Sequence, residues 1–352
     1  MTKIRCAICG SHDTRLYFEV RNSPLLQNVL CDDESSARLV RTTNAPFWAC
    51  VNCLFLFNPE FVASDYSTEY NNDQSLSPRY REHIEEVVSF VTAGSREDIR
   101  ILEIGCGNGL VLKTLQEHGH TDLEGYDPAH AGHLPYVKTS LWTPSDRKYD
   151  TIILRHTLEA VDRFEELLGN AASRLDANGQ LYLEFTNSRV IIERSATVTL
   201  YHEYPHYFSE SALAILFARL GMYVHETRHF FGGELTGMLA RRQQLRPPRS
   251  ASFERLRPFQ NVCIWGVSGR SVHFLTNYAE HLASIKFGVD LDPRKQGKFV
   301  PHSGQKIISP EECFVRRPDA VIILNEHYVT EVANLFPYPV TILTAKDFYV
   351  EG

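Results

Sequence analysis

The sequence has no long hydrophobic run. None of its segments approaches the roughly 20 apolar residues that a bilayer-spanning helix needs, and its first residues, Met-Thr-Lys-Ile-Arg-Cys, lack the apolar stretch of a secretory signal peptide. Basic residues are not in excess either, since the net charge is −7, which gives no electrostatic attraction to nucleic acid or to an anionic membrane. We find no repeats and no low-complexity tract. These absences favour a cytoplasmic globular protein that binds neither nucleic acid nor membrane.

A glycine-rich turn follows an apolar strand at residues 101–109, which read Ile-Leu-Glu-Ile-Gly-Cys-Gly-Asn-Gly. Glycines at this position let the backbone turn tightly and approach a ligand closely before the helix expected at 110–117. The spacing differs from the dinucleotide pattern Gly-x-Gly-x-x-Gly, and Glu103 stands two residues before the first glycine. The glycines are Gly105, Gly107 and Gly109. This variant suits a nucleoside ligand without a pyrophosphate and predicts S-adenosylmethionine; the alternative is a similar turn in another α/β enzyme.

Three further side chains are expected at this cofactor site. Asp127 ends the next strand, 123–126, where an acid is placed to bind a ribose hydroxyl pair. His156 follows the strand 151–154 at the edge of the sheet where ligands of open α/β sheets bind, so we expect it near the methyl-donor end. Tyr70 lies in a polar and aromatic loop and is expected to close over the cofactor.

Eight cysteines in a chain without a secretion signal favour reduced thiols and metal ligation over disulfides. Four of them form two Cys-x-x-Cys pairs, and two such pairs make a tetrahedral zinc site with no position left for a catalytic water. We therefore predict a structural zinc ion, the alternatives being a redox pair or chance. The predicted ligands are Cys6, Cys9, Cys50 and Cys53. The remaining cysteines are interpreted as small buried apolar residues: Cys31, Cys106, Cys263 and Cys313.

The pattern of strands and helices predicts an α/β protein with three parts. These are an N-terminal zinc-binding module, 1–60, a Rossmann-like methyltransferase core, 61–240, and a C-terminal Rossmann-like domain, 241–352. The core is predicted to contain a loop at 61–80, helices at 77–92 and 163–175, a turn at 176–179 and a strand at 180–185. A segment rich in Arg and Pro, 241–258, is a predicted linker. The C-terminal strands are expected at 261–267, 287–291 and 319–324.

The C-terminal domain also has a glycine turn, Gly266-Val-Ser-Gly269, after its first strand. By itself it is a weak phosphate-binding signal, and a tight turn without a ligand is an equal alternative.

The order of these parts resembles the zinc-binding, S-adenosylmethionine-dependent class I C-methyltransferases that build branched deoxysugars on nucleotide carriers. The resemblance covers nearly the whole chain. Besides the glycine turn, it rests on the following segments: Arg155-His-Thr-Leu-Glu159, Tyr201-His-Glu-Tyr-Pro-His-Tyr-Phe-Ser209, Trp265-Gly-Val-Ser-Gly-Arg-Ser271, Val289-Asp-Leu-Asp-Pro-Arg-Lys-Gln-Gly-Lys-Phe-Val-Pro301 and Ile308-Ser-Pro-Glu311. It implies C-methylation of a nucleotide-linked keto-deoxysugar, with the C-terminal domain contributing to acceptor binding.

The sequence departs from the family where catalysis is expected. The family has Tyr-His-Glu-His in the second of these segments, and its last histidine is a base candidate, but this chain has Tyr204. A second histidine of the family is Ala160 here. Enolate chemistry requires a general base and a group that stabilises the oxyanion. The predicted catalytic residues are Tyr201, His202, Glu203, Tyr204 and His206, with Glu203 and His206 as the base candidates.

Other readings stay open at this point. The altered residues are compatible with O- or N-methylation of another natural-product or cell-surface glycan intermediate. They are also compatible with a non-catalytic regulatory protein that binds zinc and S-adenosylmethionine. His202 and His206 could merely flank a helix start, for which Ser209 and Ser211 are N-cap candidates, and Glu203 could be a buried structural side chain.

Overall fold

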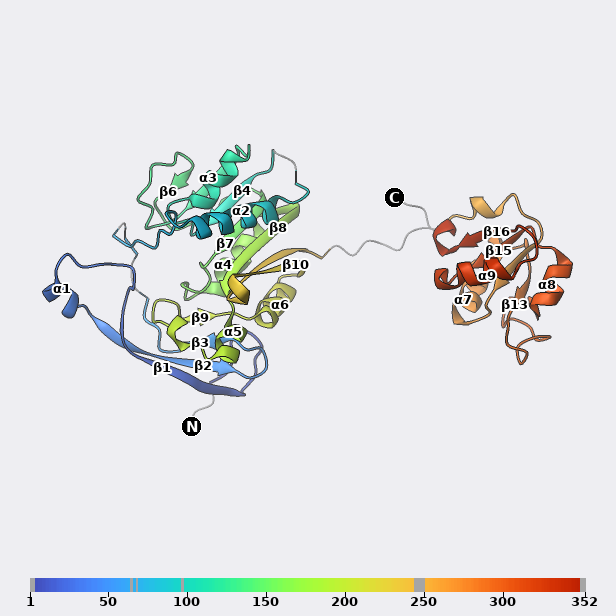
Figure 1. Cartoon of the computed structure of the whole chain (residues 1–352), viewed down its shortest axis with the longest axis horizontal. Helices are drawn as coiled ribbons and strands as arrows, with labels where there is room; N and C mark the ends of the chain where they lie inside the picture. The colour runs from blue at the N-terminus through green and yellow to red at the C-terminus, as the bar shows by residue number, and fades with distance from the viewer. Residues whose placement is uncertain (1–3, 64–65, 68, 96–97, 244–250, 349–352) are drawn as a thin grey trace. The chain divides into compact units, whose positions relative to one another are not determined.

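The computed structural model describes residues 4–63, 66–67, 69–95, 98–243 and 251–348. The chain divides into two units, Met1–Gln244 and Leu245–Gly352, which Figure 1 colours from blue to yellow and from orange to red. The predicted N-terminal module and the core both belong to the first unit. None of the helices within these ranges is long and apolar enough to cross a membrane.

A seven-stranded sheet forms the centre of the first unit, with strand order β10-β11-β8-β7-β4-β5-β6. All neighbours pair in parallel except β10 with β11 and β11 with β8, which are antiparallel. Its strands are β4 (Ile101–Ile104), β5 (Leu123–Tyr126), β6 (Val137–Lys138), β7 (Tyr149–Arg155), β8 (Leu175–Thr186), β10 (Met222–Phe230) and β11 (Leu235–Arg242). This arrangement confirms the predicted Rossmann-like α/β class.

Helices pack on both faces of this sheet because successive strand residues point to opposite sides. Leu102 and Ile104 face the core that contains α4 (Phe164–Ser173) and α6 (Glu210–Arg219). Ile101 and Ile153 face the other core, which contains α2 (Pro78–Thr92) and α3 (Leu110–Glu117). Ser77 caps α2, and its predicted apolar face is buried as expected: Ile84, Val87, Val88 and Val91. A short helix, α5 (Ser188–Arg194), follows β8.

The N-terminal residues form a second, antiparallel sheet that a strand from the core completes. Its order is β1-β2-β3-β9, and β9 pairs Tyr207 with Leu56 and His206 with Phe57. The strands are β1 (Thr14–Pro24), β2 (Thr42–Cys50), β3 (Leu56–Phe57) and β9 (His206–Tyr207), with helix α1 (Glu34–Arg38) between β1 and β2. The segment predicted to carry catalysis is therefore attached to the N-terminal sheet.

Four local predictions need correction. The turn predicted at 176–179 lies within β8, where it makes an irregularity in the pairing with β7 between Tyr149 and Thr151. The helix predicted at 163–175 ends earlier, at Ser173. The linker predicted at 241–258 begins inside β11, and its residues 244–250 lie outside the described residues. Cys31 is exposed, whereas Cys106, Cys263 and Cys313 are buried as predicted.

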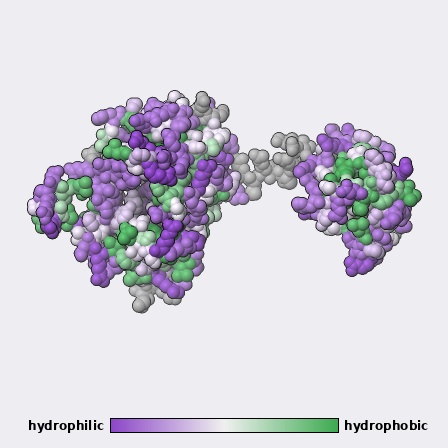
Figure 2. All heavy atoms as spheres, viewed as in Figure 1, coloured by the Kyte–Doolittle hydropathy of each residue, from purple (hydrophilic) through white to green (hydrophobic). Residues whose placement is uncertain are grey.

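The second unit is built on a five-stranded parallel sheet of order β14-β13-β12-β15-β16. Its first strand, β12, is central, which is the Rossmann-like arrangement expected from the sequence. The elements are β12 (Val262–Trp265), α7 (Gly269–Asn277), β13 (Ile285–Val289), β14 (Lys306–Ile308), α8 (Pro310–Arg316), β15 (Ala320–Ile323), α9 (Val329–Leu335) and β16 (Thr341–Thr344). Hydrophilic residues cover most of the visible face of each unit in Figure 2, with smaller apolar groups between them.

Candidate active site

The glycine loop after β4 has the backbone that its sequence predicted. Gly105, Gly107 and Gly109 have φ angles of 74°, 55° and 77°, a region that favours glycine. A Cβ on Gly105 would lie 2.3 Å from Thr157 Oγ1, so this glycine is required by the packing of the turn itself. A Cβ on Gly107 would meet nothing within 4 Å. The loop is therefore open at Gly107, where a ligand can approach the backbone.

Asp127 follows β5 and is held beside this loop. Its Oδ2 accepts a hydrogen bond from Gly107 N (2.8 Å) and its Oδ1 accepts one from Ala129 N (2.8 Å). Each carboxylate oxygen can accept a further hydrogen bond. The loop and the acid thus fit the amino-acid and ribose portions of S-adenosylmethionine.

Replacing Asp127 by Ala is expected to weaken S-adenosylmethionine binding by about 10- to 100-fold, because a hydrogen bond to a charged group contributes about 1.5–3 kcal/mol. Isothermal titration calorimetry measures this directly. The matched control is Asp122→Ala, at the opposite end of β5, where the carboxylate pairs with Arg147. Unchanged affinity in the Asp127 variant would contradict the assignment.

Glu103 is buried on β4, and its Oε2 has no hydrogen-bond partner among the described residues. Burial raises the pKa of Glu103 to about 8, and the Asp127 and Glu184 carboxylates oppose the lowering effect of Arg155. The side chain is therefore largely protonated at neutral pH until a cation is bound next to it. The cationic amino group of S-adenosylmethionine fits this orphaned carboxyl.

Glu103 should make folding less favourable as the pH rises. Its ordinary pKa of 4.5 is raised to about 8 on folding, so between these values the folded chain binds one proton more than the unfolded chain. The free energy of unfolding then falls with pH, by up to about 1.4 kcal/mol per pH unit. Urea unfolding at pH 6, 7 and 8 should show a steeper fall for the cofactor-free wild type than for Glu103→Gln. Equal slopes would contradict the account.

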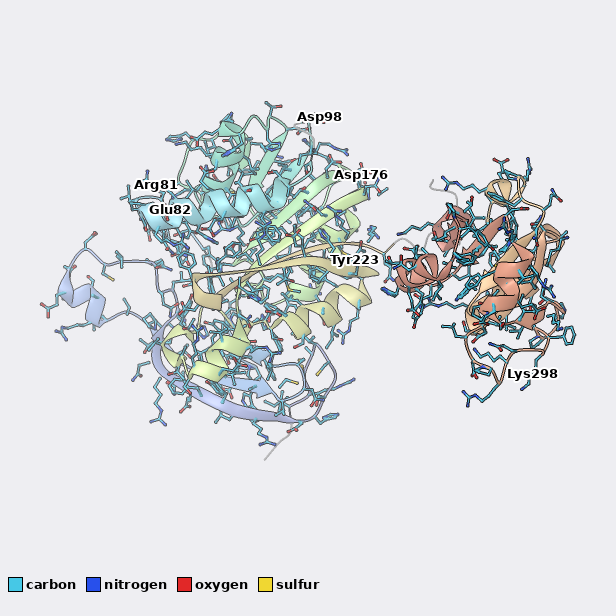
Figure 3. All side chains as sticks on the ribbon, turned by 45° about the vertical axis from the view of Figure 1, so that its right-hand side comes forward. Arg81, Glu82, Asp98, Asp176, Tyr223 and Lys298 are labelled. Atoms are coloured by element: carbon cyan, nitrogen blue, oxygen red, sulfur yellow. The ribbon has the colours of Figure 1, made fainter. Side chains whose placement is uncertain are left out.

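A buried network of charges lies at the carboxyl edge of β7 and β8. Glu184 Oε1 accepts hydrogen bonds from Arg155 (2.8 and 3.1 Å) and His83 Nε2 (3.1 Å), and Glu184 Oε2 accepts one from Tyr182 (2.8 Å). His83 comes from the inner side of α2, whose outer side carries Arg81 and Glu82, labelled in Figure 3. The sequence did not point to Glu184 or His83, and it marked Arg155 only as part of the segment 155–159, because nothing local links three such distant positions.

His156 joins this network to Glu159. Its Nδ1 lies 3.3 Å from Glu159 Oε1 and its Nε2 lies 3.4 Å from Glu184 Oε1. Burial acts to lower the pKa of His156, but the contacts with Glu159 and Glu184 outweigh it and raise the pKa to about 10. Glu159, the last residue of the segment 155–159, also accepts a hydrogen bond from Thr186 N (3.0 Å).

Glu203 is the centre of a cluster of hydroxyl groups. Its Oε1 accepts hydrogen bonds from Tyr70 and from Tyr66 (3.3 Å), and its Oε2 accepts one from Gln27 N (3.0 Å). Tyr70, predicted at the cofactor, thus contacts Glu203. The predicted residues Tyr201 and Tyr204 pack against each other with ring centroids 4.8 Å apart. Burial raises the pKa of both hydroxyl groups, so they remain neutral donors.

The two predicted histidines of this segment lie in different surroundings. His206 stacks on Phe55 and packs edge-on against Phe164, with centroids 5.7 and 4.7 Å apart, and burial lowers its pKa to about 4. His202 Nε2 lies 3.2 Å from Val62 O. These are the surroundings of core side chains. The catalytic roles of both residues stay predictions.

Hydrogen bonds connect the glycine loop to the Glu203 cluster. Thr157 Oγ1 donates to Ile104 O (2.9 Å), which fixes the turn after β7 against β4. His206 N donates to Glu159 O (3.3 Å), which places the segment 201–209 against the same turn. Asp73, three residues after Tyr70, accepts from Asn108 of the glycine loop (3.3 Å). The predicted cofactor and catalytic residues therefore belong to one region of the first unit.

The four predicted metal ligands come together in the N-terminal part. The Sγ atoms of Cys6 and Cys53 lie 3.7 Å apart, those of Cys9 and Cys50 lie 3.4 Å apart, and all four lie within 4.8 Å of one another. Four thiolates at about 2.3 Å from a tetrahedral zinc ion lie about 3.8 Å from each other. Each pair lies in a turn of the same kind. In the first turn Cys6 O accepts a hydrogen bond from Gly10 N, and in the second Cys50 O accepts one from Leu54 N. The donor set fits a closed Cys₄ zinc site.

The second unit has a cavity of about 550 Å³ at the carboxyl edge of its sheet. The cavity is lined by Gly266, Ser268 and Gly269 of the glycine turn, by Asp290 and by Lys295. Asp290 Oδ2 accepts from Val267 N (2.9 Å) and Lys295 Nζ (2.7 Å), and Oδ1 accepts from Asp292 N (3.0 Å). Asp127 of the first unit is also held by two backbone N–H groups. In each unit, therefore, an aspartate after the second strand of the βαβ segment accepts a hydrogen bond from the glycine turn.

Comparisons with known proteins agree with this architecture. A methyltransferase-domain model matches residues 77–227, and a model of the C-methyltransferase C-terminal domain matches residues 233–337. C-methyltransferase NovU of Streptomyces niveus is 22% identical over 394 aligned residues, which cover 93% of this chain and 90% of NovU.

Solved structures of other methyltransferases resemble part of the chain. Magnesium protoporphyrin IX methyltransferase from Synechocystis PCC 6803 shares 18% identity, with 47% of this chain and 84% of that chain covered and a TM-score of 0.39. The CcbJ methyltransferase from Streptomyces caelestis shares 14% identity, with 47% and 97% covered and a TM-score of 0.36.

Proposed function

Because the chain belongs to an S-adenosylmethionine-dependent C-methyltransferase family, we propose that it methylates a carbon atom of a nucleotide-linked keto-deoxysugar. It is an enzyme acting on a small molecule, and not the regulatory protein that the sequence left open. S-adenosylmethionine supplies the methyl group when it is bound to Gly105, Gly107, Gly109, Asp127 and Glu103.

The observation that carries the proposal is the environment of Glu203. The residue is 2% exposed, and its carboxylate accepts hydrogen bonds from two tyrosines of the loop before α2. A carboxylate in this position can take the proton from the carbon next to a keto group, which leaves an enolate as the nucleophile. Tyr66 and Tyr70 hold this carboxylate through their hydroxyl groups, and Tyr201 is a neutral hydroxyl group that can donate to the acceptor. Positioning of the nucleophile supplies much of the remaining rate enhancement.

We further propose that the cavity of the C-terminal unit binds the nucleotide carrier of the acceptor. Cβ atoms on Gly266 and Gly269 would meet nothing within 4 Å, so the turn that begins α7 is open to a phosphate. Arg270 lines the same cavity and offers a guanidinium to a phosphate, whereas Lys295 is paired with Asp290. The zinc ion, held by its four cysteines, is proposed to be structural.

Methylation of an oxygen or nitrogen atom is the second candidate reaction, because Tyr204 and Ala160 stand where the deoxysugar C-methyltransferases that the sequence resembles have histidines. Solvent exchange separates the two. Enolisation in the absence of the methyl donor should replace the acidic C–H of a keto-sugar acceptor by deuterium in D₂O, detected by NMR. If a methylated product forms but no exchange occurs, the nucleophile is oxygen or nitrogen and C-methylation is wrong.

A further inference from the structure

We propose that His156 is a fixed imidazolium that stabilises the negative charge formed on the acceptor oxygen, and that Glu159 and Glu184 are positioning residues that keep it charged. The inference rests on the proposed function, since the charge in question is that of the enolate. It gives His156 a catalytic role in place of the cofactor contact that the sequence predicted.

Both ring nitrogens of His156 lie against carboxylate oxygens, at 3.3 Å from Glu159 and 3.4 Å from Glu184. A neutral imidazole donates from only one nitrogen, whereas the imidazolium donates from both. Two carboxylates that face the two ring nitrogens therefore favour the charged form. The imidazolium has no free ring lone pair, so His156 in this form cannot be the general base.

The charges around the ring favour a second cation, the imidazolium of His156, in addition to Arg155. Glu159 and Glu184 are buried carboxylates, and the guanidinium of Arg155 balances one of them. The other groups that face the network are Tyr182 on β8 and His83 and Tyr80 on α2, while Glu103 lies near Arg155 and is largely protonated at neutral pH. An uncompensated buried carboxylate is costly, and the imidazolium of His156 compensates it.

His156 is the member of the trio that a ligand can reach. Its side chain is 24% exposed, whereas those of Glu159 and Glu184 are 1% and 0% exposed. It follows β7 at the carboxyl edge, beside the glycine loop of β4, where ligands of such sheets bind. Its φ angle of 52° is unusual for a residue other than glycine, and such backbone strain is concentrated at functional sites.

The chemistry balances without a further reactant. The carboxylate of Glu203 takes the C–H proton, the C–H electron pair forms the C=C bond of the enolate, and the carbonyl π pair moves to the oxygen. His156 can offer its Nε2–H to this oxygen, because its contact with Glu184 Oε1 is long, at 3.4 Å, and that oxygen already accepts from Arg155 and His83. The enolate carbon then bonds to the methyl group, and the electrons of the broken C–S bond stay on sulfur.

The test follows the protonation of His156 by NMR of the protein labelled with ¹³C at histidine Cε1, with His156→Asn assigning the signal. The wild type should show an imidazolium at pH 8. Glu159→Gln should show a neutral ring at pH 8, whereas Glu159→Asp should restore the imidazolium. A neutral ring in the wild type at pH 8 overturns the proposal.

Activity provides the second readout. Turnover of Glu159→Gln should be near that of the wild type at pH 6 and should fall as the pH rises to 9, by about 10²–10³-fold for loss of an oxyanion donor, while the wild type changes little. An equal loss at every pH would indicate a merely structural role. If the wild type exchanges the acceptor C–H and His156→Asn exchanges it equally fast, the role of His156 is contradicted while the proposed function stands. If the wild type itself shows no exchange, the proposed function fails.

Discussion

Glu203→Gln is expected to lower turnover by about 10²–10⁴-fold, the usual effect of losing a general base. The amide keeps the shape of the side chain but cannot accept the acceptor's proton. S-adenosylmethionine binding should be unchanged, because the glycine loop and Asp127 are intact. Steady-state kinetics and calorimetry on the same preparation measure the two effects.

Two further variants make this result specific. Glu193→Gln removes an exposed carboxylate of α5 that pairs with Arg189, and it should leave turnover unchanged. His206→Phe tests the other predicted base, because phenylalanine suits the aromatic surroundings of Phe55 and Phe164. Full activity of Glu203→Gln together with loss of activity in His206→Phe would transfer the base role to His206.

Cys50→Ser is expected to have the largest effect on stability. A structural zinc site contributes about 10–16 kcal/mol to folding, which is comparable to the whole stability of an ordinary domain. Loss of one thiolate should therefore lower the melting temperature strongly and make the chain poorly soluble. The effect should extend to the segment 201–209, since β9 pairs with β3.

The matched control is Cys31→Ser, which changes an exposed cysteine outside the cluster. It should leave the melting temperature and the metal content unchanged. Metal analysis should find one zinc ion per wild-type chain. The account of the N-terminal part would be wrong if no zinc were found and Cys50→Ser melted like the wild type.

Local patterns were sufficient to predict the shape of the turn at residues 105–109. Gly105, Gly107 and Gly109 have the positive φ angles that the sequence indicated, and Asp127, at the end of the next strand, lies beside them. The binding roles of these residues stay predictions. The two Cys-x-x-Cys turns are local in the same sense. Their pairing could be predicted as well, because a closed site needs four thiolates and the sequence offers two suitable pairs.

The remaining contacts join distant parts of the chain, and no periodicity reports on them. Pairing of β9 with β3 brings His206 next to Phe57, and it places this base candidate in an aromatic core with Phe55 and Phe164. Glu184 gains a partner from α2 in His83. The segment 176–179 has the composition of a turn, but pairing between β7 and β8 keeps it within a strand. Tertiary packing decided these positions against local preference.

We propose above that this methyltransferase forms a carbon–carbon bond on a keto sugar. Incubation with [methyl-¹³C]S-adenosylmethionine and a panel of nucleotide-linked keto-deoxysugars tests it most directly, with the labelled atom located by ¹³C NMR of the product. The labelled methyl signal should lie in the chemical-shift range of a methyl group bound to carbon, and it should form with the wild type and about 10²–10⁴-fold more slowly with Glu203→Gln. A methyl signal in the chemical-shift range of a methoxy or N-methyl group would contradict it.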